Sequence, residues 1–357
     1  MSTLDFIYDG HGANWPAHGG FDATALCDAP HGLSGTELPM FGMALELAKA
    51  GHEVSIYSRF KARRQHPFVD IRPGANRGKV VGLVNYLDLD DEKPACDIAV
   101  AFHDARRLDG WPAHKKVAVH QSFLVPNRQQ DASFTGADFA DIYITATDHV
   151  ARHLERAYGW PRVHVVPNAW DMGTFHPWDP IPGRLIFTTS LERGFHRLLE
   201  IFPFIRQRVP HAHIVAFERG GPAVDALRSN PVDGVTLVPT ASRNAVLAEL
   251  SRAACFAYPC DPPAPTEVFP LSVLDACATG VPVVLAPADG IEKLFDGGVL
   301  LTPPVAHYES REPLVDAVCR MLTDSAHAKE WSARGTQWAD PYRFTNTTKA
   351  FCEAVGL

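Results

Sequence analysis

The chain has 357 residues, of which 46% are hydrophobic and 21% are charged, and its formal net charge is −8. This length suits two domains better than one hydrophobic core, and the composition is that of an ordinary soluble globular protein. The negative charge argues against a general nucleic-acid-binding protein, which would present a basic surface, so we expect no nucleic-acid partner.

Short apolar runs alternate with helical patterns through the first half, as is typical of a parallel α/β domain. Strands are expected at 4–8, 53–57, 97–102, 116–119, 141–145 and 163–166. A helix is expected after the loop that ends at Gly35 and Thr36, and Gly51 is expected to close it. His103 and His120 each follow a strand directly, where the carboxyl ends of parallel strands form a ligand-binding crevice.

Two charged segments of the first half have alternative interpretations. The basic run within 59–68 also contains two phenylalanines, so it suits either a peripheral contact with an anionic membrane or a solvated helix face. The acidic run Asp88–Asp91 offers carboxylates for a metal ion, but we interpret it as a surface turn.

The second half begins after the proline-rich linker 178–183, which we take as the domain boundary. Strands are expected at 184–189, 213–217, 235–238, 255–258 and 281–286, with helices between them. The first of these strands leads through Ser190 into a turn that carries Arg193. A guanidinium there suits a phosphate group, because its planar fork donates two hydrogen bonds at once.

The run TEVFPLSVLDACATGVP combines two carboxylates with the start of a helix. Pro270 suits the first helical position, where its missing N–H is not needed. Glu267 stands just ahead of this helix, whose free N–H groups at Leu271 and Ser272 can face an anion. Asp275 follows Glu267 by eight positions and lies in the early turns of the same helix.

This acid pair resembles the E-x7-E signature of retaining glycosyltransferases with the GT-B fold, most closely the group-4 family (glycosyl transferases group 1). The run 141–177 is similar to the strand, helix and "VIPNGVD" passage that closes the first domain of that family. The run 290–304 is similar to its "GGIPEVVxDGxxGLLVPP" passage. The resemblance covers nearly the whole chain and implies an α/β protein with two Rossmann-like domains that face each other across a cleft.

The resemblance also implies which part of the chain binds each substrate. It gives an N-terminal acceptor domain at 1–177, a nucleotide-sugar domain at 178–335, and a C-terminal helix within 336–357 that crosses back to the first domain. The implied activity is that of a retaining, metal-independent hexosyltransferase without a cofactor. The donor would be a nucleotide-diphosphate sugar, and the acceptor a small molecule, a glycan or a lipid-linked compound.

In the family, the first acid contacts the donor sugar, the second holds the ribose, and the helix N-terminus takes the diphosphate. Carried over to this sequence, the catalytic residues are Glu267, His120 and Arg193, with His120 approaching the sugar from the opposite domain. The residues implied in donor binding are Asp275, Phe269, Leu271, Ser272, Gly35, Thr36 and Ser190. No metal-binding residue is implied.

Three departures from the family pattern keep alternatives open. Asp275 is one methylene shorter than the usual Glu, and Pro270 offers no N–H. Ser190 stands where the family has an Arg, which leaves Arg193 alone in the phosphate clamp unless Arg197 or Arg219 compensates. The alternatives are a nucleotide-sugar 2-epimerase or glycogen-synthase-like polymerase on the same fold, and a catalytically silent sugar-nucleotide-binding protein.

The seven cysteines are scattered without a CxxC pair, which predicts reduced, mostly buried thiols rather than disulfides or a zinc site. No apolar run approaches the length of a membrane span, and the N-terminus lacks the pattern of a signal peptide. These features predict a cytoplasmic protein, either free or peripheral to the membrane.

Overall fold

The computed structural model divides into two compact units, Met1–Met172 with Tyr342–Leu357, and Gly173–Pro341, here called the first and the second unit. The sequence-based limits, at 177 and 335, lie a few residues from these. The structure describes residues 1–8, 27, 35–58, 64–69, 80–121, 139–218, 221–239, 241–261, 267–304 and 311–357.

The first unit is built on an eight-stranded sheet with the order β3-β4-β2-β1-β5-β6-β7-β8. All neighbouring strands are parallel except β3 and β4, which are antiparallel. The strands are β1 Thr3–Ile7, β2 Glu53–Ser58, β3 Arg64–Val69, β4 Val80–Asp88, β5 Cys96–Phe102, β6 Ala113–His120, β7 Ile142–Thr145 and β8 Val163–Val165. The predicted strands of the first half are therefore confirmed, whereas β3 and β4 were not predicted.

Strand β3 corrects one interpretation of the basic run. Residues 64–68 of that run lie in an edge strand paired with β4, so a helix face is wrong for them. An edge strand tolerates Pro67, because proline lacks a backbone N–H and one side of an edge strand makes no hydrogen bonds to a neighbouring strand. Residues 59–63, the rest of the run, lie outside the described residues.

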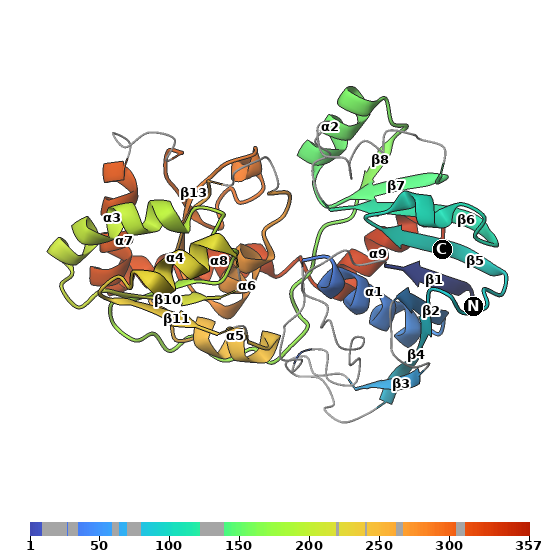
Figure 1. Ribbon diagram of the computed structural model, residues 1–357, viewed down its shortest axis with the longest axis horizontal. Coiled ribbons are helices and arrows are strands. Elements are labelled where there is room, and N and C mark those ends of the chain that lie inside the picture. The colour runs from blue at the N-terminus through green and yellow to red at the C-terminus, as the bar shows by residue number, and fades with distance from the viewer. Residues whose placement is uncertain are drawn as a thin grey trace. The chain divides into compact units, whose positions relative to one another are not determined.

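The helices of the first unit are α1 Glu37–Lys49, α2 Asp148–Tyr158 and α9 Phe344–Val355, with a 3-10 turn at Ala105–Leu108. The C-terminal helix α9 packs beside α1 (Figure 1), and Gly42 makes this possible. A Cβ atom at Gly42 would lie 2.1 Å from the ring of Phe344. Phe6 of β1 contacts Phe351 of α9 and Phe102 of β5, with centroid distances of 6.2 and 5.7 Å.

The second unit is built on a six-stranded parallel sheet with the order β11-β10-β9-β12-β13-β14. Its strands are β9 Arg184–Phe187, β10 His213–Phe217, β11 Val235–Val238, β12 Cys255–Pro259, β13 Val283–Ala286 and β14 Leu300–Leu301. Its helices are α3 Phe195–Arg208, α4 Pro222–Ser229, α5 Arg243–Leu250, α6 Leu271–Thr279, α7 Arg311–Thr323 and α8 Ser325–Ala339.

Helices cover both faces of this second sheet. Helices α3 and α7 contact each other and β12, whereas α5 contacts α6. Figure 1 shows α3 and α7 above strands β10 and β11, and α5 below them. The second unit is therefore a doubly wound Rossmann-like domain.

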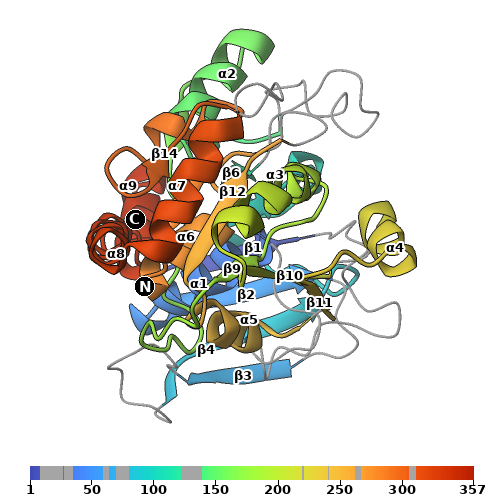
Figure 2. The same cartoon turned by 90° about the vertical axis from the view of Figure 1, so that its left-hand side faces the viewer.

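Each sheet has a point where its strand order reverses. In the second unit the chain runs outward from β9 through β10 to β11 (Figure 2), and then returns to β12 on the other side of β9. The reversal therefore lies between β9 and β12. In the first unit it lies between β1 and β5. Ligands of doubly wound sheets bind outside the carboxyl ends of the strands at such switch points.

Candidate functional site

The strongest candidate site lies at the switch point of the second unit. Arg193 sits in the turn after β9, and Glu267 follows β12, so the two strands that flank the reversal each deliver one charged residue. The turn is closed by the N–H of Arg193, which donates to the carbonyl oxygen of Ser190 at 3.0 Å. Both predicted residues therefore reach the place where this fold binds ligands.

Gly194 brings the two loops together. Its φ of +109° lies in the region that favours glycine, and an added Cβ atom would lie 1.8 Å from the carbonyl oxygen of Pro259 at the end of β12. Only glycine lets the turn that carries Arg193 approach the neighbouring strand this closely.

Both carboxylate oxygens and the backbone N–H of Glu267 have partners. Its Oε1 forms an ion pair with Arg193, its Oε2 accepts a hydrogen bond of 2.6 Å from the hydroxyl of Tyr258, and its N–H donates to Asp289 Oδ2 at 3.1 Å. The Glu267 side chain is 3% exposed and that of Arg193 is 34% exposed. A carboxylate is stable at such depth only when charges and donors surround it. The sequence predicted both charged residues but not their pairing.

Burial keeps two neighbours of this pair in their neutral forms. It raises the pKa of Tyr258 well above its ordinary value and raises the pKa of Cys260 to about 11. Tyr258 therefore remains a hydrogen-bond donor to Glu267 at neutral pH. Sequence reasoning missed Tyr258, because the run CFAY reads as an apolar strand and its hydroxyl gives no separate signal.

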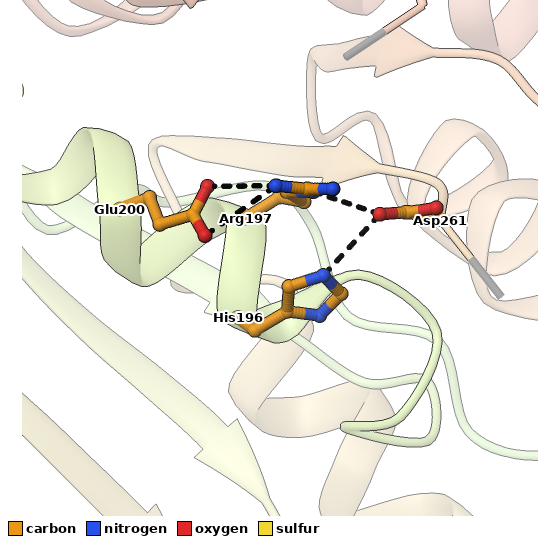
Figure 3. A network of polar contacts seen from close by, with 4 residues as sticks. All are labelled: His196, Arg197, Glu200 and Asp261. Carbon is orange, nitrogen blue, oxygen red and sulfur yellow. Dashed lines mark hydrogen bonds and ion pairs between the residues drawn. The ribbon is translucent and has the colours of Figure 1, made fainter. Parts of the chain in front are cut away.

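A second polar network fixes the start of α3 to the end of β12 (Figure 3). Asp261 Oδ2 accepts hydrogen bonds from Arg197 Nε at 2.7 Å and contacts His196 Nε2 at 3.2 Å. Arg197 also bonds to Glu200 at 3.1 Å. Arg197, considered above as a second phosphate-binding cation, is therefore engaged by two carboxylates. Arg219, the other candidate, lies outside the described residues.

Helix α6 begins one residue later than predicted. Pro270 is its N-cap with an extended ψ of 104°, and not its first helical residue. The carbonyl oxygen of Pro270 accepts hydrogen bonds from the N–H groups of Val273 and Leu274. Within the described part of the chain, the N–H groups of Leu271 and Ser272 have no such partner, and both residues are partly exposed. They are the free donors of a helix N-terminus.

Phe269, which precedes this N-terminus, turns its side chain inward. It is buried, and its ring packs against Phe295 with a centroid distance of 6.5 Å. The backbone of Phe269, and not its ring, is thus the part that lies next to the helix start.

Asp275 is paired inside the second unit. Both of its carboxylate oxygens accept hydrogen bonds from Arg243, at 2.7 and 2.8 Å, and the two side chains are 10% and 9% exposed. Arg243 is the first residue of α5, whose N-cap is Ser242. A bidentate buried pair of this kind fixes α5 against α6. No local pattern indicates that Arg243, at the start of α5, and Asp275, one turn into α6, meet in the fold.

The first unit holds the remaining predicted residues. His120 ends β6, is 1% exposed, and lies edge-on to Trp160 at 4.9 Å. Burial, with a smaller contribution from His103, lowers the pKa of His120 to about 3, so its ring is neutral at physiological pH. Thr36, which follows the exposed Gly35, occupies the N-cap position of α1, and its hydroxyl lies 2.5 Å from His103 Nε2.

The contact between Thr36 and His103 lies at the switch point of the first sheet, because His103 follows β5 and Thr36 ends the loop after β1. The predicted site residues are therefore divided between the units. The first holds Gly35, Thr36 and His120, and the second holds Ser190, Arg193, Glu267, Phe269, Leu271, Ser272 and Asp275.

Metal binding, membrane crossing and the state of the cysteines were also considered in the sequence-based expectations. Among the described residues, no group of three His, Cys, Asp or Glu side chains is arranged to hold a metal ion. In the same residues, no helix has the length and apolar character needed to cross a bilayer. The seven cysteines are free thiols, all buried except Cys352, as predicted.

The sequence of the second unit matches a known family. Residues 182–324 fit the sequence model described as Glycosyl transferases group 1, and this segment contains Arg193, Glu267 and Asp275. This segment is therefore similar to a glycosyl transferases group 1 domain. The D-inositol 3-phosphate glycosyltransferase of Xylanimonas cellulosilytica is 25% identical, over 44% of this chain and 47% of that protein. The match thus spans about half the length of this curated relative.

Solved structures resemble both units together. Sucrose-phosphate synthase from Thermosynechococcus elongatus aligns with a TM-score of 0.69 at 14% identity, over 99% of this chain and 98% of that chain. The HepE protein of Anabaena, in complex with UDP and glucose, aligns with a TM-score of 0.68 at 13% identity over the full length of both chains. The segment that matches the family model thus lies in the second of two Rossmann-like domains, and the predicted GT-B fold is confirmed.

Proposed function

We propose that this protein is a retaining glycosyltransferase that moves a sugar from a nucleotide-diphosphate sugar to an acceptor. The observation that carries the proposal is the Arg193–Glu267 pair at the switch point of the glycosyl transferases group 1 domain. The GT-B fold, the family match and the binding of UDP and glucose by the HepE protein support it.

The start of α6 suits the leaving diphosphate. The N–H groups of Leu271 and Ser272 and the positive end of the helix dipole favour a negative charge there. Arg193 adds a mobile cation, since a third of its side chain is exposed. Together these preorganised donors would stabilise the charge that develops on the diphosphate as the bond to the anomeric carbon breaks.

The carboxylates would hold the two sugars of the donor. Glu267 is proposed to accept hydrogen bonds from hydroxyls of the transferred sugar, and its charge would favour the oxocarbenium-like carbon. Asp275 is proposed to bind the ribose while Arg243 retains one of its oxygens. Gly35, Thr36, Ser190 and the backbone of Phe269 complete the proposed donor contacts, and His120 is proposed as a neutral catalytic residue.

The acceptor is a small molecule, a glycan or a lipid-linked compound, and the reaction needs no metal ion or cofactor. The protein works in the cytoplasm, and the segment 59–68 is its proposed contact with the membrane surface.

The proposal is tested by measuring the melting temperature with UDP, GDP, ADP, CDP and dTDP, each beside its nucleoside monophosphate as control. A ligand that binds only the folded protein raises the melting temperature, by about 5–10 °C at a hundredfold excess over Kd. We expect one diphosphate to give this shift and its monophosphate a smaller one, because the α6 N-terminus and Arg193 receive the second phosphate. No shift with any of the five would contradict a donor site.

A further inference from the structure

We propose that Tyr258 is a positioning residue for the donor sugar. Its hydroxyl holds Oε2 of Glu267 both without and with the donor. Only Oε1 exchanges its partner: it pairs with Arg193 in the free protein and accepts a hydrogen bond from a sugar hydroxyl when the donor binds. This inference rests on the proposed function. It adds that the ion pair between Arg193 and Glu267 exists before the donor binds and is broken by the donor.

The surroundings of Tyr258 leave its hydroxyl in one place. The residue lies on the central strand β12 and is fully buried. Its ring contacts Phe187 and Phe256 with centroid distances of 5.8 and 5.9 Å. At 2.6 Å, its hydrogen bond to Glu267 has the short length of a hydroxyl that donates to a carboxylate. A packed aromatic ring cannot change its rotamer without disturbing the core around it.

Arg193, the partner of the other oxygen, is placed differently. It stands in a turn, its side chain is 34% exposed, and it is long enough to change rotamer without disturbing packed residues. The diphosphate carries charge that competes directly for this guanidinium. The two oxygens of Glu267 therefore have one fixed and one exchangeable partner.

While Tyr258 holds Oε2, Glu267 cannot follow Arg193 with its side chain. Its N–H donates to Asp289, and its side chain is 3% exposed. Once Arg193 turns to the diphosphate, Oε1 needs a new donor, because a buried carboxylate oxygen without a partner is costly. The hydroxyls of the transferred sugar are donors of the right kind. Binding of the diphosphate and recognition of the sugar are therefore coupled through one carboxylate.

The variant Tyr258→Phe removes the fixed hydrogen bond and retains the buried ring. Glu267 is then free to turn with Arg193, so we expect nucleotide-sugar binding to weaken by about 10- to 100-fold. Binding of the nucleotide diphosphate alone should stay within about twofold, since the hydroxyl that is removed donates to Glu267 and is not one of the proposed phosphate donors. A purely structural role would weaken the binding of both ligands together.

The experiment compares Kd values by calorimetry for UDP and UDP-glucose, GDP and GDP-mannose, and ADP and ADP-glucose. Tyr57→Phe is the matched control, because Tyr57 is also fully buried and its hydroxyl donates a long hydrogen bond of 3.4 Å to the carbonyl oxygen of Glu92 in the first unit. An unchanged ratio of the two Kd values in Tyr258→Phe would overturn the inference alone. A wild-type protein that binds none of these ligands would overturn the proposed function as well.

Discussion

Replacement of Glu267 by glutamine is expected to lower the turnover of the nucleotide sugar by about 10²- to 10³-fold, the loss typical of one preorganised electrostatic group in an active site. Glutamine keeps the shape of the side chain and an oxygen that accepts from Tyr258. It removes the negative charge that faces Arg193 and the anomeric carbon. Binding of the nucleotide diphosphate should be retained, because its proposed donors are Arg193 and the start of α6.

Glu249→Gln provides the matched control for that measurement. Glu249 of α5 also pairs with an arginine, Arg184, in the same unit. Arg184 begins β9, so this pair lies at the amino end of the sheet, away from the switch-point loops. Turnover should be close to that of the wild-type protein in this control. If turnover also persists in Glu267→Gln, Glu267 is not part of the catalytic machinery.

Replacement of Arg243 by glutamine is expected to lower the free energy of unfolding of the second unit by about 3–5 kcal/mol, the usual cost of removing one partner of a buried ion pair. The loss leaves the Asp275 carboxylate at 10% exposure without its two charge-assisted hydrogen bonds. Denaturation by urea, followed by the fluorescence of tryptophans in the second unit, gives this quantity.

Arg206→Gln is the control for the buried pair. Arg206 pairs with Asp233 at 2.5 Å, but Asp233 is 88% exposed, and such surface pairs contribute about 0–1 kcal/mol. A loss in Arg243→Gln as small as in this control would show that the pair does not hold α5 against α6. The double variant Arg243→Met with Asp275→Leu should recover much of the stability, because no uncompensated charge remains.

The sequence predicted the features that depend on local pattern. Short β-branched runs lie in the parallel strands, and Gly280 ends α6 in the left-handed conformation that favours glycine at a helix end. Arg193 and Glu267 could be found because each lies in the loop between a strand and the helix that follows it, and because Glu267 and Asp275 resemble the E-x7-E pattern. Loops after strands at a switch point carry ligand-binding residues in this kind of fold.

The features that were missed depend on contacts between distant residues. Arg243 and Asp275 are 32 positions apart, and nothing in either helix shows that they pair. Tyr258 lies in a strand that is otherwise apolar, so its sequence context does not mark it. Its proposed role depends on the fold of the loop that brings Glu267 back to its hydroxyl. Helix α8 was not predicted, because only three of its residues, Ala328, Gly335 and Ala339, are buried, which leaves a weak apolar stripe.

The most direct test of the central claim is to follow the wild-type protein with each nucleotide sugar by proton NMR, with water as the acceptor. We expect one donor to release its nucleotide diphosphate slowly, and the first sugar signal to be the anomer with the configuration of the donor. Release of the opposite anomer would contradict the retaining mechanism. No release from any donor whose nucleotide binds would contradict transferase activity and support a catalytically silent sugar-nucleotide-binding protein.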